Sequence, residues 1–217
     1  MKKSVNLFFF LLLIGLEFVA QIPVVSMSAM NYGYFGIDNE IDIAVSECRC
    51  QDLIVTSDNG TIGGKNCHYI LKPAHIGQAN ISIKVKRKNA VDELGTSAII
   101  IYRVPDPVVT SNAFNLTDTI SNKELLIQSP TLTCRLPGFR IEYVFRIIHY
   151  RLTIYRNSSI YYQENSDSNS ISDALKTKLT TLIDGDVLSF DEIIVESGEG
   201  KRNLSPIKKI YYSRNKD

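Results

Sequence analysis

The sequence contains no tryptophan, although it has 11 tyrosines and 9 phenylalanines. A sugar-binding β-sandwich would be expected to stack its ligand on tryptophan as well as on tyrosine, so the composition counts against that class of protein. Three of the aromatic residues, Tyr32, Tyr34 and Phe35, stand close together at the start of the first β-rich segment. They either form an exposed patch suited to a protein interface or fill the packing face of the first strand.

Histidine is also scarce, and recognisable catalytic motifs are missing from the sequence. His68, His75 and His149 are spread over both halves of the chain, and a lone histidine is more often a surface or core residue than a catalyst. The acidic residues between Asp184 and Glu192 lack the alternating oxygen pattern of a calcium loop. No Gly-x-Ser-x-Gly elbow, phosphate-binding loop or His-Glu-x-x-His appears. The sequence therefore predicts a non-enzymatic protein with no catalytic residues, no cofactor and no metal.

Neither half of the chain has an excess of one charge. Residues 22–104 contain 8 Lys/Arg and 8 Asp/Glu, and residues 105–217 contain 14 of each. Such neutrality exerts little long-range attraction on nucleic acid or on an anionic membrane. Protein partners, including a second copy of the chain, are therefore the expected ligands, and nucleic acid is not.

Residues 1–20 are typical of a signal peptide. Two lysines precede the apolar run Leu7–Leu16, and the small residue Ala20 follows shortly after it. Glu17 interrupts the run well short of the about 20 apolar residues that a membrane-spanning helix needs. We therefore expect cleavage after Ala20, a periplasmic, secreted or cell-surface location, and no membrane span in the mature chain.

Four cysteines follow the predicted signal peptide. In an exported protein a disulfide is the first expectation, and Cys67 is predicted to pair with Cys50 or, alternatively, with Cys48. A zinc site is disfavoured because the spacing Cys48-x-Cys50 is narrower than usual and no second such pair follows. Cys134 lies among apolar residues and is predicted to be a buried, reduced thiol.

Residues 22–104 are predicted to form an all-β domain. Apolar and polar residues alternate through Ile41–Val45, Tyr69–Leu71 and Ile81–Val85, and Asn59-Gly60 supplies a turn. No helical period appears in this half. About seven short strands in roughly 80 residues predict an immunoglobulin-like β-sandwich.

A proline-flanked connector follows this domain. Proline restricts its own φ and pushes the preceding residue toward extended conformations. Pro105, Asp106 and Pro107 are therefore predicted to form a stiff, extended interdomain hinge.

Residues 105–217 are predicted to form an α+β domain, in which one amphipathic helix lies on an antiparallel sheet. Ser172 is expected to cap that helix, and Asp184-Gly185 to end it. The apolar face of the helix is predicted to consist of Leu175, Leu179, Leu182 and Ile183. The segments predicted to be β-rich are 125–136, 141–155, 187–195 and 207–212.

Several segments, taken in order, resemble the last two periplasmic domains of GldM, also called PorM, a family of the bacterial gliding-motility and type IX secretion machinery. The resemblance covers roughly residues 31–212. No single motif is specific to the family, but the order of the motifs over two domains is specific. The matching segments are Tyr32–Asn39, Asn59-Gly60, Lys72-Pro73, Gly77–Ile81, Pro105–Pro107, Ser121 with Lys123 and Leu126 (or Leu125, with the step shifted by one), and Gly185–Ile193.

The resemblance implies domains that hold and transmit contacts and perform no covalent chemistry. It departs from the family at Gly138–Tyr143, where an acidic-aromatic stretch is usual. The family's membrane helix, which couples to the proton-driven motor, is not among the matching segments, so that role is not implied. The expected function is an exported protein-binding scaffold, and the alternative is a secreted carbohydrate- or surface-binding β-sandwich module.

Overall fold

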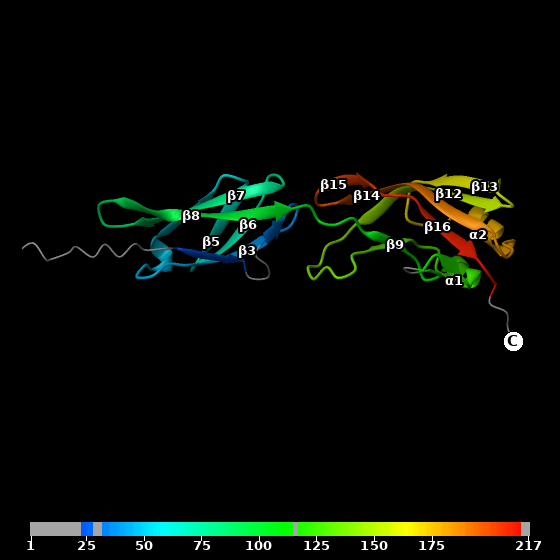
Figure 1. Ribbon diagram of the computed structural model, residues 1–217, viewed down its shortest axis with the longest axis horizontal. Helices are drawn as coiled ribbons and strands as arrows, with labels where there is room; N and C mark the ends of the chain where they lie inside the picture. Colours follow the sequence, from blue (N-terminus) through cyan, green and yellow to red (C-terminus); the bar gives the residue numbers. More distant parts are fainter. Residues whose placement is uncertain (1–22, 28–31, 115–116, 214–217) are drawn as a thin grey trace, which may run out of the picture. The chain divides into compact units, whose positions relative to one another are not determined.

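The computed structural model describes residues 23–27, 32–114 and 117–213 (Figure 1). The predicted signal peptide lies outside these residues. The chain divides into two compact units. Unit 1 contains the described residues up to Tyr34 and those from Asp38 to Tyr102, and unit 2 contains Phe35–Ile37 and the described residues from Arg103 onward.

Unit 1 is a β-sandwich, as predicted, with two four-stranded sheets among the residues described. One sheet has the order β1-β3-β6-β5 and is antiparallel throughout. Its strands are β1 (Val24–Met27), β3 (Asn39–Ala44), β6 (His68–Lys72) and β5 (Thr61–Lys65). The other sheet has the order β2-β8-β7-β4, in which only β2 and β8 are parallel. Its strands are β2 (Tyr32–Tyr34), β8 (Val91–Tyr102), β7 (Gly77–Lys86) and β4 (Leu53–Ser57).

The core of unit 1 follows from the two-residue period of its strands. Successive side chains of a strand point to opposite faces, and β7 accordingly buries Ala79, Ile81, Ile83 and Val85 while the residues between them are half-buried. The facing sheet contributes Ile41 and Ile43 from β3, and Tyr69 and Leu71 from β6. The apolar face of each sheet is thus covered by the other, which is the arrangement of a sandwich.

A buried asparagine explains why two of the sequence motifs occur together. Asn59, 1% exposed, accepts hydrogen bonds at Oδ1 from the backbone N–H groups of Ala74 and His75, at 3.0 and 3.1 Å. Gly60 has a φ of +89°, and a Cβ there would lie 2.1 Å from the carbonyl oxygen of Lys72. The Lys72-Pro73 backbone can pass this close to the Asn59-Gly60 turn only because glycine has no Cβ. The two motifs therefore occur together.

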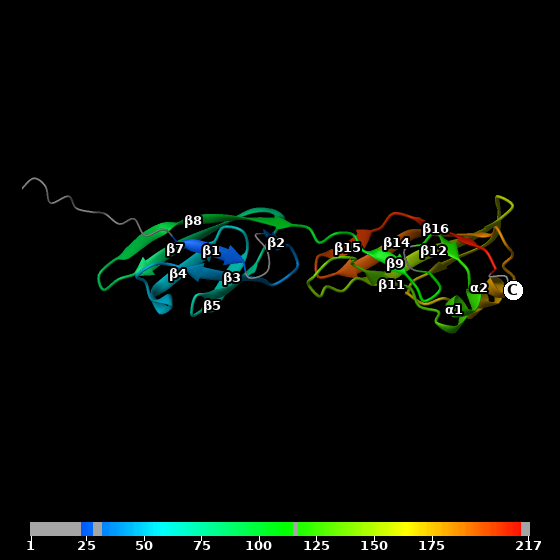
Figure 2. The same cartoon turned by 60° about the horizontal axis from the view of Figure 1, so that its bottom comes forward.

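Unit 2 is built on one six-stranded sheet with the order β10-β16-β14-β12-β13, and β15 pairs with the free end of β14. Its strands are β10 (Thr119–Ile120), β16 (Ile207–Tyr211), β14 (Val187–Ser197), β12 (Arg146–Arg156), β13 (Ser159–Ser166) and β15 (Gly200–Asn203). A separate antiparallel pair consists of β9 (Val108–Thr110) and β11 (Thr133–Arg135). The helices α1 (Lys123–Gln128) and α2 (Asp173–Thr180) contact each other at one end of the unit (Figures 1 and 2).

Helix α2 begins where the sequence predicts and ends three residues early. The Ser172 hydroxyl accepts a hydrogen bond from the Leu175 N–H at 3.0 Å, which is the predicted cap. The helix stops at Thr180 because the buried Asp186 carboxylate accepts the N–H of Ile183 at 3.0 Å. Leu182 is still buried, but Ile183 is 51% exposed, so its predicted place on the packing face is wrong.

Two segments predicted to be β-rich are not strands along their whole length. Residues 123–128 form α1, whose first turn is capped by the Asn122 side chain accepting from the Glu124 N–H at 3.1 Å. Leu126 is the one residue of α1 that is buried. One buried residue shows no repeating pattern of apolar positions, so the sequence does not distinguish a short helix from a strand here. Likewise β12 begins only at Arg146, since residues 141–145 have no regular structure.

Candidate functional site

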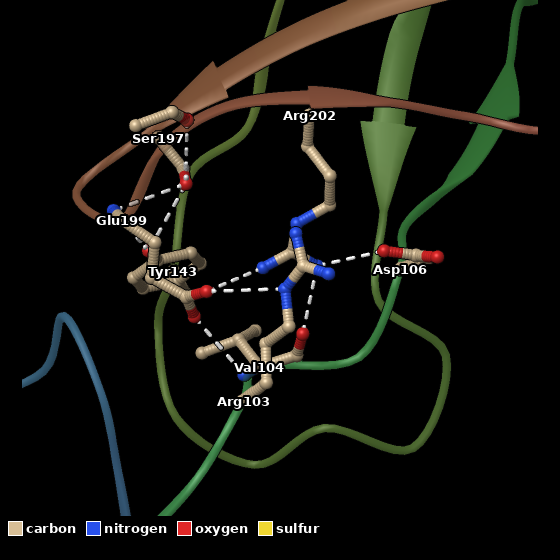
Figure 3. Close-up of polar contacts among 8 residues, drawn as sticks. Arg103, Val104, Asp106, Tyr143, Ser197, Glu199 and Arg202 are labelled. Atoms are coloured by element: carbon tan, nitrogen blue, oxygen red, sulfur yellow. Dashed lines mark hydrogen bonds and ion pairs between the residues drawn. The ribbon is translucent and has the colours of Figure 1, made fainter. Parts of the chain in front are cut away.

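The predicted connector is attached to unit 2 by a buried side chain. Residues 103–107 form neither helix nor strand, and Val104 is only 1% exposed. Arg202 on β15 donates from Nη1 to the carbonyl oxygen of Val104 and to Oδ1 of Asp106, both at 2.8 Å (Figure 3). The connector therefore begins as part of unit 2, with its path set by a residue nearly one hundred positions later.

Glu199 completes this cluster from the turn between β14 and β15. Its Oε2 accepts from Arg202 Nη2 at 2.6 Å and lies 3.5 Å from Arg103 Nε, while its Oε1 accepts the N–H of Val104 at 3.0 Å (Figure 3). The side chains of Arg202 and Glu199 are 4% and 5% exposed. A buried ion pair must recover a large desolvation cost, and these additional hydrogen bonds provide part of that recovery.

Tyr143 supports the turn that carries Glu199. Its hydroxyl donates to Ser197 Oγ and accepts the N–H of Glu199, each at 3.2 Å (Figure 3). The neighbouring Phe145 ring lies with its centroid 5.0 Å from the Arg202 guanidinium carbon, within cation–π range. We call Arg103, Val104, Asp106, Tyr143, Ser197, Glu199 and Arg202 the junction cluster. The contacts of the junction cluster can fix the path of the connector, residues 103–107.

Gly198 and Glu199 form the hairpin turn between β14 and β15. The sequence analysis did not single out Glu199 or Arg202. An acidic and a basic residue around a hairpin turn are usually solvated, so their spacing gave no indication of burial. Of the predicted hinge residues, Asp106 is brought into the cluster, Pro107 is buried, and Pro105 is exposed.

Of the two alternatives for Tyr32, Tyr34 and Phe35, the burial of Tyr34 favours a packing role for that residue. Tyr34 is 8% exposed and packs edge-on against Tyr32, with ring centroids 5.6 Å apart. Tyr32 also packs edge-on against Tyr102 of β8, at 5.3 Å. Tyr32 and Phe35 are half-buried. Tyr34 therefore serves as a packing residue, because its strand lies against β8.

The cysteines are arranged largely as predicted. Cys50 and Cys67 form a disulfide with Cα atoms 5.0 Å apart, so the pairing uses Cys50 and not the alternative Cys48. Cys134 is reduced, but it is half-buried where full burial was expected, because β11 belongs to a small two-stranded pair. Burial nevertheless raises the pKa of the Cys134 thiol to about 11.

Two surface hollows have lining residues that are not part of the junction cluster. One, of about 480 Å³, lies over β3, β5 and β6 and includes Gly63 and His68. The other, of about 580 Å³, includes Tyr155, Ile183 and Val187 in unit 2. Within the ranges described, no group of three or more His, Cys, Asp or Glu residues could hold a metal ion, and no helix is long and apolar enough to cross a membrane.

The chain is a β-sandwich module followed by an α+β module. This architecture by itself does not specify a function. Residues 22–99 match the family model of the GldM third domain. The resemblance to GldM is thereby confirmed for the stretch that forms most of unit 1. No curated protein matches the chain.

A comparison with solved structures returns matches at low sequence identity and low TM-score. The Yersinia pseudotuberculosis adhesin InvE is 12% identical, with a TM-score of 0.30; the match covers 87% of this chain and 58% of the InvE chain. Domains 6–7 of the surface layer protein SbsC are 11% identical, with a TM-score of 0.32; the match covers 88% of this chain and 98% of that one.

Proposed function

We propose that this chain is an exported, non-enzymatic scaffold protein that binds protein partners and acts in gliding motility or type IX secretion. The observation that supports this most strongly is the match of residues 22–99 to the GldM third domain. The balanced charge of each half favours recognition by shape and apolar contact, so binding is expected to depend weakly on salt.

The junction cluster supports a scaffold role. A protein that presents two surfaces to its partners benefits from a connector that is held in one conformation, because ordering a loose segment costs binding free energy. Arg202 and Glu199 hold the backbone of Val104 at both its N–H and its carbonyl oxygen. We further propose that 22–104 and 105–217 are separately folding domains joined by this connector.

The proposed location is the periplasm or the cell surface, with the signal peptide removed after Ala20. The Cys50–Cys67 disulfide supports an oxidising compartment. Mass spectrometry of the protein purified from envelope fractions tests the cleavage. A mature N-terminus at Gln21 supports it, and an intact Met1 contradicts it.

Deletion of the gene in its native organism tests the link to motility and secretion. We expect reduced colony spreading or reduced release of type IX cargo, restored by the wild-type gene. In vivo cross-linking of a tagged chain should recover a component of that machinery. If both phenotypes are normal and the cross-linked partners lie outside the machinery, the link is wrong.

Purified mature protein distinguishes the scaffold from the carbohydrate-binding alternative. The recovered protein component should bind the chain in isothermal titration, with an affinity that changes little between low and physiological salt. Saturable binding to purified surface polysaccharide, without binding to that component, would instead establish the alternative.

A further inference from the structure

Strand β5 of unit 1 has a free edge. It is the last strand of the sheet β1-β3-β6-β5 and pairs only with β6, over its whole length from Thr61 to Lys65 (Figure 2). Among the described residues, no backbone hydrogen bond reaches this strand from its other side. Such an edge carries N–H and C=O groups with which another strand can pair.

The hairpin turn between β5 and β6 determines which of these groups point outward. Asn66 and Cys67 have φ values of 56° and 66°, as in a two-residue type I′ turn. Such a turn closes with a hydrogen-bonded pair, which here includes Lys65. Hydrogen-bonded and non-bonded pairs then alternate along the hairpin. The N–H and C=O groups of Gly64 and Ile62 therefore face the free edge.

Gly63, in the middle of β5, is a glycine that neither the backbone conformation nor crowding requires. Its φ is not positive, and a Cβ at this position would have no atom within 4 Å. Each other glycine among the described residues has either a positive φ or an atom within 4 Å of an added Cβ. Glycine weakens a strand interior and often marks a place where another backbone approaches closely. The missing side chain leaves room for such an approach from outside the molecule.

The space beside Gly63 is the hollow of about 480 Å³ over β3, β5 and β6, which Ile70 also lines. Ile70 is paired with Gly63 in the hairpin, and it is 42% exposed. Because Gly63 has no side chain, no neighbour at that position covers Ile70. A large apolar side chain placed over Gly63 would therefore bury apolar surface of Ile70.

Lys65 sets the charge at one end of this edge. It is exposed and also lines the hollow. In the ion pairs nearby, His68 pairs with Asp42 and Lys72 pairs with Asp38, and neither pair involves Lys65. Opposite charges on adjacent strands stabilise a sheet. An acidic residue on an added strand, opposite Lys65, would supply that opposite charge.

We propose that the free edge of β5 binds an extended segment of a partner protein as an additional antiparallel strand. A large apolar side chain of the partner lies in the hollow over Gly63 and Ile70. Main-chain hydrogen bonds to Ile62 and Gly64 supply affinity, and side chains at alternate positions supply specificity. The site rests on the proposed protein-binding function and names the surface that performs it.

The geometry of β5 specifies the sequence of the partner segment. Residues 61, 63 and 65 share one face of the strand because side chains alternate. Read from its N-terminal end, an antiparallel partner meets Lys65 first, then Gly63 and then Thr61. We therefore expect an acidic residue, a large apolar or aromatic residue and a β-branched residue at alternate positions.

Peptide binding to the purified mature chain tests the proposal. The probe is acetyl-Ser-Glu-Thr-Phe-Thr-Val-Ser-amide, titrated into isotope-labelled protein and followed by amide NMR spectra. We expect saturable shifts at residues 61–65 and at Ile70. Alanine in place of the peptide's phenylalanine should weaken binding at least about fivefold, as for an anchor residue. Methylation of both threonine backbone nitrogens should abolish binding, because these N–H groups face Ile62 and Gly64.

Variants of β5 separate binding from folding. Gly63→Val should abolish peptide binding by filling the hollow, and the melting temperature should stay the same or rise, because valine favours strands and its Cβ meets no atom. Thr61→Val is the matched control on the same face of the same strand, and it should bind as wild type does. Lys65→Glu should weaken binding, and a peptide with lysine in place of glutamate should restore it.

An absence of saturable shifts overturns the proposal, and so do equal affinities of wild type and folded Gly63→Val. If Gly63→Val does not fold, the alanine and methylated peptides decide. Shifts of the same amides on concentrating the protein without peptide would assign the edge to a second copy and also overturn the proposal. A motility or secretion component that binds wild type and Gly63→Val equally overturns this site alone and leaves the scaffold function standing.

Discussion

Arg202 donates to the carbonyl oxygen of Val104 at 2.8 Å, across 98 residues of sequence. Both residues are buried, and the same guanidinium reaches Asp106 and Glu199. The first residues of the connector are thereby ordered by the hairpin between β14 and β15.

Replacing Arg202 should destabilise unit 2 strongly. In Arg202→Met the buried Glu199 carboxylate loses its main counter-charge, and breaking one side of a buried ion pair typically costs about 3–5 kcal/mol. Urea unfolding of the purified chain measures this cost. Arg146→Met is the matched control, because Arg146 pairs with Glu196 at the surface and its side chain is 72% exposed; a change within about 1 kcal/mol is expected there. Equal midpoints for the two variants would contradict a structural role for the cluster.

Removing the disulfide should destabilise unit 1. Loss of a native bridge from a small exported domain typically costs about 2–5 kcal/mol, and Cys67→Ser removes the disulfide partner of Cys50. The melting temperature should fall under oxidising conditions, whereas wild type and variant should converge in excess reductant. An unchanged melting temperature under oxidising conditions would show that the bridge contributes nothing.

Asp186 should make unit 2 sensitive to acid. Burial by itself raises the pKa of Asp186, but hydrogen bonds from Arg156, at 2.6 and 3.0 Å, and from the Ile183 N–H outweigh it, so the pKa is lowered overall. A carboxyl group with a lowered folded-state pKa contributes stability above its unfolded pKa, about 3.9 for Asp. That contribution is lost as the pH falls further, through the folded pKa.

The Asp186→Asn variant tests this expectation. Its unfolding free energy at pH 7 should be lower than that of wild type, and the difference should shrink between pH 4 and more acid conditions. Asp167→Asn serves as the surface control, because the Asp167 side chain is 92% exposed. A difference between Asp186→Asn and wild type that stays constant down to the acid limit would show that the carboxylate charge is not what stabilises the helix end.

Cys134 should react slowly in the native protein. With the pKa of the Cys134 thiol raised to about 11, only about one molecule in a thousand carries the thiolate at pH 8, and the thiolate is the nucleophile. Alkylation by iodoacetamide should be far slower in native protein than in urea. Comparable rates in the two states would show that the site opens readily.

Glycine at both hinge prolines should loosen the connector. Glycine reaches more backbone conformations than proline, so Pro105→Gly with Pro107→Gly should lower the amide order parameter of Asp106 toward the flexible range, below about 0.6. A partner that needs both domains should then bind more weakly. If order parameters and affinity are both unchanged, the junction cluster alone is sufficient to stiffen the connector.

The parts of this structure that could be predicted depend on local pattern. The alternation through Ile81–Val85 and the cap at Ser172 are each read from a few neighbouring residues, because strand period and helix capping act over short distances. Helix α1 was missed because one turn around Leu126 has too few residues to show a period.

The sequence by itself determined the two-part β-rich organisation, the reduced state of Cys134, the disulfide partner Cys67 and the resemblance to GldM, since these depend on period, composition and the order of motifs. Only the tertiary structure decided that Cys50 pairs in place of Cys48, that Tyr34 is buried, and that Arg202 and Glu199 hold Val104. Each of these depends on which residues distant in sequence meet in space. Burial then gives a charged pair a structural role that the same two residues would not have in solvent.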